Sequence, residues 1–358
     1  MCSEKERNIN MIYPKVFIIV LNWNGLQDTL ECLESVYKLE YLNFEVVVVD
    51  NGSSDDSVTA IRNAYPQVTL IENDKNLGFT GGNNIAMRYA IRHGCDYMWL
   101  LNNDTIVEPN TLSTLVASAQ KSLNIGMVSP IICYYDEPTK VQFHGSYIDC
   151  KNFSTPCISG IVLYKQEYKR HMIVLWGTAL LIKRGIVERV GYLNEKYFAY
   201  QEDCEYSLRV YNAGYRNIVE SKAKVYHKSS RSTSVSGEES PIKAFLMTRN
   251  WYFFWMDNLK GLRRVHYFRQ YIAHTILYAV SLNNKNLAES ADACFDGAWA
   301  AIRGIGGSWD ESVSMPGTLK KVLHVLCSWH PYFLTDLLRG DFSKITSEIL
   351  KRAKAKIM

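Results

Sequence analysis

Two stretches decide the fold: VFIIVLN at residues 16–22 and FEVVVVDN at residues 44–51. Both are almost wholly apolar and rich in β-branched residues, as expected of parallel strands that are covered on both faces. Between them, apolar residues recur at helical spacing from Leu26 to Tyr37. A strand, a helix and a second strand in this order predict a parallel sheet with helices on its faces.

The same alternation continues to about residue 134. We expect a helix over 55–64, a strand over 68–73, a helix opened by Gly81-Gly82 and ending at His93, a strand over 97–104, and a helix with Pro109 in its first turn. This order predicts an α/β protein with a Rossmann-like, mostly parallel sheet flanked by helices. Further strands are expected over 173–183 and 217–227, with a short helix after the first of them.

Polar side chains stand where the expected strands end. Asn22, Asp50, Asn73 and Asp104 all occupy such positions, and ligands of open α/β sheets bind at the carboxyl ends of the strands. Asp50 is suited to accept the ring N–H of uracil or thymine or to contact ribose; as an alternative, it caps a helix or a turn. Asp104 is suited to hold a hard divalent cation, because Mg²⁺ often takes one or two carboxylates and substrate phosphates. Capping of the next helix is the alternative for Asp104.

A glycine-rich segment, NLGFTGGN at residues 76–83, leads into a helix. Small residues such as Gly78 and Gly81 let backbone N–H groups approach an anion at a helix N-terminus. The segment has neither the GxGxxG fingerprint nor the ending of a phosphate-binding P-loop. A tight turn without a ligand is therefore the alternative interpretation.

Two adjacent carboxylates, Glu202 and Asp203, lie between the aromatic run YFAY and an amphipathic segment. Either one is suited to accept a proton, whereas the alternative is a pair of surface charges in the first turn of a helix. His227 ends the expected strand 217–227, and a single histidine of this kind is more often structural than a ligand.

After Pro241 the composition changes and the rest of the chain is expected to be helical. We predict a domain built on the sheet over 14–240 and a helical region over 241–358, with a loop or boundary at 231–240 and an insertion or β-ribbon at 135–175. Aromatic and basic residues crowd at 243–270. They suit either helices that pack on the catalytic domain or contact with a membrane surface. The aromatic residues of this group are Phe245, Trp251, Tyr252, Phe253, Phe254, Trp255 and Tyr267.

Composition sets further bounds. The chain has 358 residues, 47% of them hydrophobic, and a net charge of +4, which is too small to indicate nucleic-acid binding. Nine cysteines without a CxxC pair favour a reducing compartment. The N-terminus lacks the apolar core of a signal peptide. The sequence also lacks a run of about 18 apolar residues, so we expect no helix that spans a membrane. We expect a cytoplasmic protein, either free or peripheral at the inner face of the plasma membrane.

The ordered set LNWNG, VVVDNGSSDDS, NLGFTGGNN, LLNNDT, WGTALLIKR, YFAYQEDCEYSLRVYNAGY and YHKSSRST closely resembles family 2 glycosyltransferases of the GT-A fold, particularly the rhamnosyltransferase-like branch. The resemblance covers about residues 14–235, and it implies that the expected domain over 14–240 is a nucleotide-sugar-binding and catalytic domain. It implies an inverting transferase that moves a sugar from a nucleotide-diphosphate sugar to a hydroxyl group. The first choice for the sugar donor is dTDP-rhamnose, and the second choice is a UDP-sugar. The implied acceptor is a glycan or a lipid-linked molecule in surface polysaccharide biosynthesis.

The resemblance also assigns roles to residues. It makes Asp203, beside Glu202, the general base, Asp104 the metal-binding aspartate of the DXD element, and His227 a neighbour of the metal and diphosphate. Mg²⁺ or Mn²⁺ is the implied cofactor. Here the DXD element reads Asn102-Asn103-Asp104 and lacks its first carboxylate. Metal binding is therefore expected either to be weaker or to rest on Asp104, His227 and the diphosphate. The expected donor-binding residues are Asn22, Asp50, Asn51, Asn76, Gly78, Gly81, Asn102 and Asn103.

Two other functions suit a similar sheet. An NAD-dependent oxidoreductase would share the fold, but the glycine fingerprint after the first strand is missing. A metal-dependent nucleotidyltransferase would also use an α/β sheet and would release pyrophosphate instead of a nucleoside diphosphate. A sugar-binding homologue without activity is disfavoured, since the carboxylates of an active enzyme are present apart from the DXD change.

Overall fold

The computed structural model describes residues 13–157, 173–228, 240–310 and 313–329. Its contacts divide the chain into two compact units. The first unit takes in Met1–Asn194 and Glu202–Ser232, and the second takes in Glu195–Gln201 and Thr233–Met358. We call them the sheet unit and the helical unit. The functional boundary expected at residue 240 stays a prediction.

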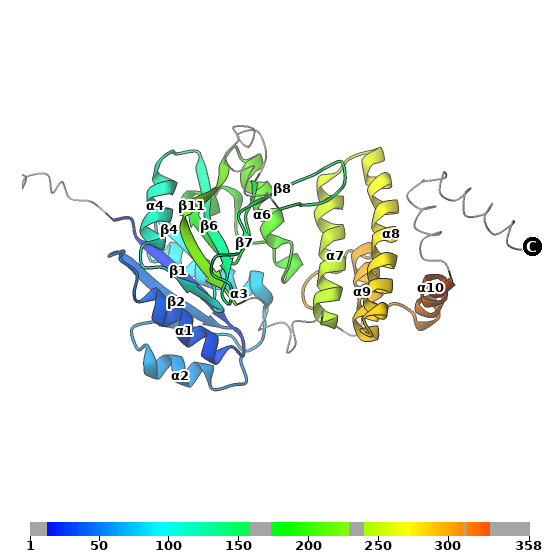
Figure 1. Cartoon of the computed structure of the whole chain (residues 1–358), viewed down its shortest axis with the longest axis horizontal. Helices are drawn as coiled ribbons and strands as arrows, with labels where there is room; N and C mark the ends of the chain where they lie inside the picture. Colours follow the sequence, from blue (N-terminus) through cyan, green and yellow to red (C-terminus); the bar gives the residue numbers. More distant parts are fainter. Residues whose placement is uncertain (1–12, 158–172, 229–239, 311–312, 330–358) are drawn as a thin grey trace, which may run out of the picture. The chain divides into compact units, whose positions relative to one another are not determined.

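The sheet unit is built on a central sheet with strand order β3-β2-β1-β4-β10-β6-β11-β5, and β7 pairs with β6 outside this path (Figure 1). The first four strands of that order are parallel, as expected. β10 is antiparallel to both of its neighbours, β4 and β6. The strands are β1 (Val16–Asn22), β2 (Phe44–Asp50), β3 (Thr69–Glu72), β4 (Tyr97–Asn102), β5 (Thr105–Val107), β6 (Ile125–Tyr134), β7 (Val141–Phe143), β10 (Ala179–Lys183) and β11 (Arg216–His227). A separate pair joins β8 (Ser146–Tyr147) to β9 (Ile173–Val174).

Helices cover both faces of this sheet, because the residues that point to either face of each central strand are apolar. In β1, Val16, Ile18 and Val20 pack into one core and Phe17 and Ile19 into the other. The first core receives residues of α1 (Leu26–Val36), α2 (Ser57–Ala64) and α4 (Thr111–Gln120), and the second those of α3 (Gly78–Arg92), α5 (Arg184–Val190) and α6 (Glu202–Asn212). Burial of the central strands on both faces explains why they read as unbroken apolar runs.

Several expected boundaries are wrong. α3 begins at Gly78, so Gly81-Gly82 lies inside the helix instead of opening it. Pro109 precedes α4, which begins at Thr111. The stretch 173–183 forms two strands, β9 and β10, separated by a turn. Within the insertion or β-ribbon expected at 135–175, residues 158–172 lie outside the described residues, and the described part contains the short strands β7 and β8, paired with β6 and β9. Of the loop or boundary expected at 231–240, residues 231–239 lie outside the described residues.

The helical unit contains α7 (Pro241–Asn258), α8 (Leu262–Asn284), α9 (Ala288–Ile302) and α10 (Gly317–Trp329). In Figure 1, α7, α8 and α9 lie side by side. α7 starts with Pro241 in its first turn, and the hydroxyl of Ser240 accepts a hydrogen bond from the backbone N–H of Lys243. Of the described helices, none is long and apolar enough to cross a membrane.

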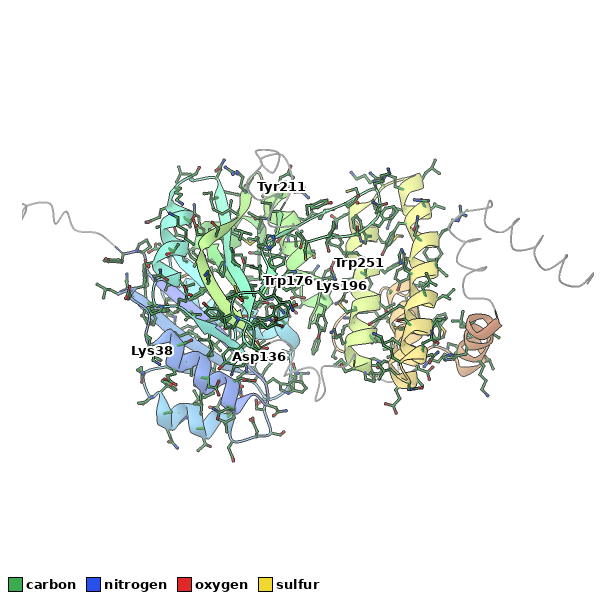
Figure 2. The ribbon with its side chains drawn as sticks, viewed as in Figure 1. Lys38, Asp136, Trp176, Lys196, Tyr211 and Trp251 are labelled. Atoms are coloured by element: carbon green, nitrogen blue, oxygen red, sulfur yellow. The ribbon has the colours of Figure 1, made fainter. Side chains whose placement is uncertain are left out.

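Most of the aromatic residues expected to crowd at 243–270 are core residues of the helical unit. Phe245, Phe254 and Trp255 are at most 1% exposed. Trp251, which is labelled in Figure 2, is half-buried, with its ring 6.0 Å from that of Phe254. The aromatic residues of α7 are thus mostly buried, and they are buried within the helical unit itself; packing of these helices on the catalytic domain stays a prediction.

A short excursion of the chain, Glu195–Gln201, belongs to the helical unit. The side chain of Asn250, on α7, donates hydrogen bonds to the backbone oxygens of Tyr197, Ala199 and Tyr200 at 2.7–2.8 Å. Tyr200 and Gln201 have φ angles of 69° and 68°, in the left-handed region that is costly for residues other than glycine. The amide of Asn250 thus helps to hold a strained segment, and the next residue in the chain is Glu202.

Candidate active site

The carboxyl ends of β1 and β2 bring Asn22 and Asp50 into register. Nδ2 of Asn22 donates to Oδ1 of Asp50 at 2.7 Å, and Oδ2 of Asp50 accepts the backbone N–H of Ser53 at 2.9 Å. Asn22 and Asp50 are 0% and 2% exposed. The carboxylate of Asp50 is therefore fixed at the edge of the sheet, and its oxygens keep further lone pairs that can accept the N–H of a base.

Asn51 uses its whole side chain to hold the following turn. Its Nδ2 donates to Oδ1 of Asn76 and to the carbonyl of Gly78, at 2.9 and 3.1 Å. Its Oδ1 accepts from the backbone N–H of Leu77 and from Nδ2 of Asn73, both at 3.1 Å. The hydrogen bonds of Asn51 and Asn76 stabilise the turn. Contact of these two residues with a bound ligand stays a prediction.

The glycines of α3 allow close packing. A Cβ on Gly82 would lie 2.4 Å from Cδ1 of Leu21, and one on Gly81 would lie 2.8 Å from Cβ of Leu77. Gly78 has a φ of 73°, which favours glycine. The glycine-rich segment thus serves packing and the entry into the helix, and anion binding by Gly78 and Gly81 stays a prediction.

Asn102-Asn103-Asp104 lies between β4 and β5. The backbone N–H of Asn102 donates to the carbonyl of Thr178 at 2.9 Å, and Nδ2 of Asn103 donates to the hydroxyl of Thr29 at 2.9 Å. Asp104 is 4% exposed. The asparagine that replaces the first DXD carboxylate is thus built into the end of the sheet.

Asp104 lies beside His227. β11 runs antiparallel to β5 with His227 opposite Thr105, and this register places Nε2 of His227 3.2 Å from Oδ1 of Asp104. Nδ1 of His227 lies 2.9 Å from Oε1 of Gln142. Because an amide oxygen can only accept, Nδ1 carries the proton, and in the neutral ring Nε2 then turns its lone pair toward the carboxylate. Either a second proton, on Nε2, or a metal cation between the two atoms stabilises acceptors this close.

This pair suits a divalent cation. A carboxylate oxygen and an imidazole nitrogen are both metal ligands, and Gln142 orients the imidazole from behind, as the outer partners of metal-bound histidines do. The described residues contain no cluster of three or more His, Cys, Asp or Glu placed to hold an ion. The protein would thus supply two ligands, and substrate phosphates and water would have to complete the coordination.

Lys228 is a neighbour of this pair that the sequence did not single out. Its backbone N–H donates to the carbonyl of Asp104 at 2.9 Å. Its ammonium group, with the side chain 2% exposed, forms ion pairs with Asp28 at 2.7 Å and with Glu31, both on α1. Burial lowers the pKa of Lys228, but the hydrogen bonds that its ammonium group donates to the two carboxylates, together with their charges, outweigh burial and raise the pKa. Its place directly after His227 was the only signal in the sequence.

Glu202 and Asp203 open α6. Oδ2 of Asp203 accepts the backbone N–H of Gly177 at 3.3 Å, and its Oδ1 accepts that of Cys204 at 2.7 Å. Glu202 is 6% exposed, and its Oε2 is buried without a hydrogen-bond partner among the described residues. The two neighbours therefore differ. The carboxylate of Asp203 is half-buried and accepts hydrogen bonds from the backbone, whereas the carboxyl group of Glu202 is buried and one of its oxygens has no hydrogen-bond partner among the described residues.

These environments separate the two carboxyl groups electrostatically. Burial, and next the charge of Asp203, raise the pKa of Glu202 well above its usual value. Burial also raises the pKa of Asp203, but the backbone N–H groups of Cys204 and Gly177 act against it. Asp203 is therefore the member of the pair that holds a negative charge more readily, and Glu202 the one that keeps a proton.

The turn before β10 contributes an aromatic surface next to Gly177. The ring of Trp176, labelled in Figure 2, stacks on that of Phe143 with 4.2 Å between centroids and 15° between planes. A Cβ on Gly177 would lie 2.9 Å from Cζ of Phe79. The backbone N–H that bonds Asp203 thus belongs to a closely packed turn.

Residues 17–191 match the family model described as glycosyl transferase family 2. This chain carries a family 2 glycosyltransferase domain. The match confirms the resemblance read from the sequence motifs, and it includes the sheet edge with Asp50 and Asp104. Asp203 and His227 lie beyond the matched residues.

Two relatives of known name come from Mycobacterium tuberculosis. The chain is 30% identical to galactofuranosyltransferase GlfT1 over 131 residues, which are 36% of this chain and 43% of the relative. It is 27% identical to N-acetylglucosaminyl-diphospho-decaprenol L-rhamnosyltransferase over 207 residues, which are 52% of this chain and 67% of the relative. The chain thus spans less than half the length of the first relative.

Solved structures agree on the fold. The chain superposes on mannosyltransferase PcManGT from Pyrobaculum calidifontis, in complex with GDP-Man and Mn²⁺, with a TM-score of 0.52 and 19% identity over 92% of this chain and 85% of that one. This likeness confirms the expected GT-A type of α/β fold.

Proposed function

We propose that this chain is an inverting glycosyltransferase that moves a sugar from a nucleotide-diphosphate sugar to a hydroxyl group of a glycan or of a lipid-linked acceptor. The observation that carries the proposal is the state of Asp203. Its carboxylate stands half-buried at the start of α6, bonded by two backbone N–H groups, beside the more deeply buried Glu202.

In the proposed reaction, the oxygen of the acceptor hydroxyl attacks the anomeric carbon of the donor. Asp203 takes the hydroxyl proton, the bond between the anomeric carbon and the diphosphate oxygen breaks, and the nucleoside diphosphate leaves with the electron pair. General base catalysis of this kind contributes about 10²–10⁴-fold. Attack from the face opposite the leaving group inverts the anomeric centre and requires no covalent enzyme intermediate.

The site residues divide the remaining tasks. Asp50, fixed by Asn22 and Ser53, accepts a hydrogen bond from the donor base or ribose. Asp104 and His227 would hold Mg²⁺ or Mn²⁺, which would neutralise charge on the departing diphosphate. The mannosyltransferase PcManGT, with its Mn²⁺ and GDP-Man, supports this assignment by its similar fold.

For the donor we propose dTDP-rhamnose first and a UDP-sugar second. The rhamnosyltransferase relative supports the first choice, and the pathway class is surface polysaccharide biosynthesis. The galactofuranosyltransferase relative leaves other donors open.

Donor class is tested by thermal unfolding with dTDP, UDP, GDP or NAD, each with and without Mn²⁺, on wild type and Asp104→Ala. A ligand at about 100 times its dissociation constant should add about 2.7 kcal/mol to the free energy of unfolding. Metal-dependent stabilisation by one nucleoside diphosphate, lost in the variant, supports the proposal. A response to NAD alone would point to an oxidoreductase.

Catalysis is tested with Asp203→Asn, which should bind donor as the wild type does and lose transfer by about 10²–10⁴-fold. Glu205→Gln, two residues further along α6, is the matched control and should keep transfer. Full activity of Asp203→Asn would refute the assignment. Release of pyrophosphate by the wild type would identify a nucleotidyltransferase instead.

A further inference from the structure

The first two turns of α8 carry an exposed apolar strip. Leu262 is 87% exposed, Val265 59% and Phe268 36%. A helix advances about 100° per residue, so positions three apart stay on one side of it over two turns. Tyr267 faces the other way and is 2% exposed. Large apolar side chains on an outward helix face are typical of a surface that binds something.

The strip is surrounded by positive charge. Lys260, Arg263, Arg264 and Arg269 are all exposed. The sequence from residue 258 to residue 288 contains no aspartate or glutamate. Apolar and basic side chains therefore share the start of α8 and the two residues before it. Asp257, the carboxylate that directly precedes this stretch in the chain, forms an ion pair with Lys196 at 3.5 Å.

The inner side of α8 is fixed in the helical unit. The hydroxyl of Tyr267 donates to the carbonyl of Trp251 at 2.9 Å, and that of Tyr271 donates to the carbonyl of Thr248 at 3.2 Å. Both acceptors lie on α7. The face of α8 opposite the apolar strip is thus bonded to α7. The strip itself is exposed, in contrast to the buried aromatic residues of α7.

We infer that the first two turns of α8 dock on the surface of an anionic phospholipid bilayer. A helix lying in the plane of the interface inserts its apolar side chains about 5–10 Å into the boundary between headgroups and acyl chains, and its Lys and Arg side chains meet the anionic headgroups. A nucleic acid would match the charge but would leave Leu262, Val265 and Phe268 in water. The docking depends on this helix alone and not on the identity of donor or acceptor.

Vesicle flotation of the full chain tests the inference. Vesicles of phosphatidylcholine with phosphatidylglycerol should carry the protein, and vesicles of phosphatidylcholine alone should carry much less. Lys260→Gln/Arg264→Gln should lower partitioning about 25-fold, because each basic residue near an anionic surface contributes about five-fold. Leu262→Ser/Val265→Ser should lower it at least as much.

The matched control is Leu42→Ser/Leu123→Ser, which removes two leucines of the sheet unit that are 81% and 93% exposed. It should float as the wild type does, and circular dichroism melting should show that all three variants fold. Equal flotation on both kinds of vesicle, or flotation unchanged in both α8 variants, would overturn the inference. If no vesicle binds and Leu262→Ser/Val265→Ser converts a dimer to a monomer, a second copy covers the strip and the inference is also overturned.

Discussion

Nε2 of His227 lies 3.2 Å from Oδ1 of Asp104. The two residues lie far apart in the sequence, and the antiparallel pairing of β11 with β5 brings them together. Gln142 holds the far side of the imidazole ring. Orientation of the ring, in addition to its presence, is therefore expected to matter for metal binding.

Gln142→Leu should weaken binding of Mn²⁺ about 10–100-fold, the usual effect of losing the outer partner of a metal-bound histidine. Titration followed by electron paramagnetic resonance of free Mn²⁺, in the presence of a nucleoside diphosphate, measures this affinity. Gln120→Leu, on the exposed end of α4, is the control and should bind as the wild type does. Unchanged affinity in both Gln142→Leu and His227→Ala would place the metal elsewhere.

The stability of Glu202→Gln, measured relative to that of the wild type, should be higher at alkaline pH than near pH 5. Burial raises the folded-state pKa of Glu202, so the folded wild type keeps a proton that the unfolded chain releases. Its stability therefore falls as pH rises from about 4.3, the usual pKa of Glu, toward the folded-state pKa, by about 1.4 kcal/mol for each unit.

Glutamine cannot release that proton, so the variant should lack this part of the pH dependence. Urea unfolding of both proteins over a range of pH measures the difference. Parallel pH profiles for Glu202→Gln and the wild type would show that Glu202 is charged in the folded protein, contrary to its environment.

Lys228→Met should destabilise the sheet unit by about 3 kcal/mol. The substitution leaves Asp28 and Glu31 without their buried cation, and breaking a buried ion pair costs about 3–5 kcal/mol. We expect the low end because the side chain of Glu31 is 34% exposed. Denaturant unfolding is the measurement. Lys121→Met, which removes a cation 65% exposed beside Glu220, should cost about 0–1 kcal/mol, and equal losses would contradict the account.

Asn250→Ala should destabilise the helical unit by about 1–3 kcal/mol, because the backbone oxygens of Ala199 and Tyr200 lose the amide donor of Asn250, whereas that of Tyr197 keeps a hydrogen bond from Arg249. Limited proteolysis should then cut within 195–201 faster than in the wild type. Asn258→Ala is the control: the side chain of Asn258 donates to a single carbonyl, that of Phe254, on the exposed end of α7. No change in cleavage would mean that other contacts hold the excursion.

Gly297→Ala should destabilise the packing of α9 on α7 by about 1–3 kcal/mol, the usual cost of overpacking. The new Cβ would lie 2.4 Å from the carbonyl oxygen of Phe245, which is backbone and cannot turn away. Gly185→Ala, in α5, meets nothing within 4 Å and should be neutral or gain up to about 1 kcal/mol. Thermal unfolding of the two variants distinguishes these outcomes.

The sequence predicted the parallel core of the sheet unit well, because strands buried on both faces must be apolar throughout. Asn22 and Asp50 were expected at one edge, and they lie there in contact. The predicted start of α3 was wrong because Gly81 and Gly82 resemble a helix-opening turn, whereas they serve close packing on Leu77 and Leu21. Local patterns do not distinguish these two uses of glycine.

The apolar runs and the polar residues at their ends were enough to predict the α/β class and the strand-end position of Asp104. The adjacent carboxylates Glu202 and Asp203 were also found in the sequence, as candidates for the general base. Only the tertiary structure decided three other features. β10 inserts antiparallel between β4 and β6, and the imidazole ring of His227 lies between Gln142 and Asp104. The carboxylates of Asp28 and Glu31 pair with Lys228. The physical reason is that periodicity records which side of an element is buried, but strand pairing and ion pairing join residues that are far apart in the chain.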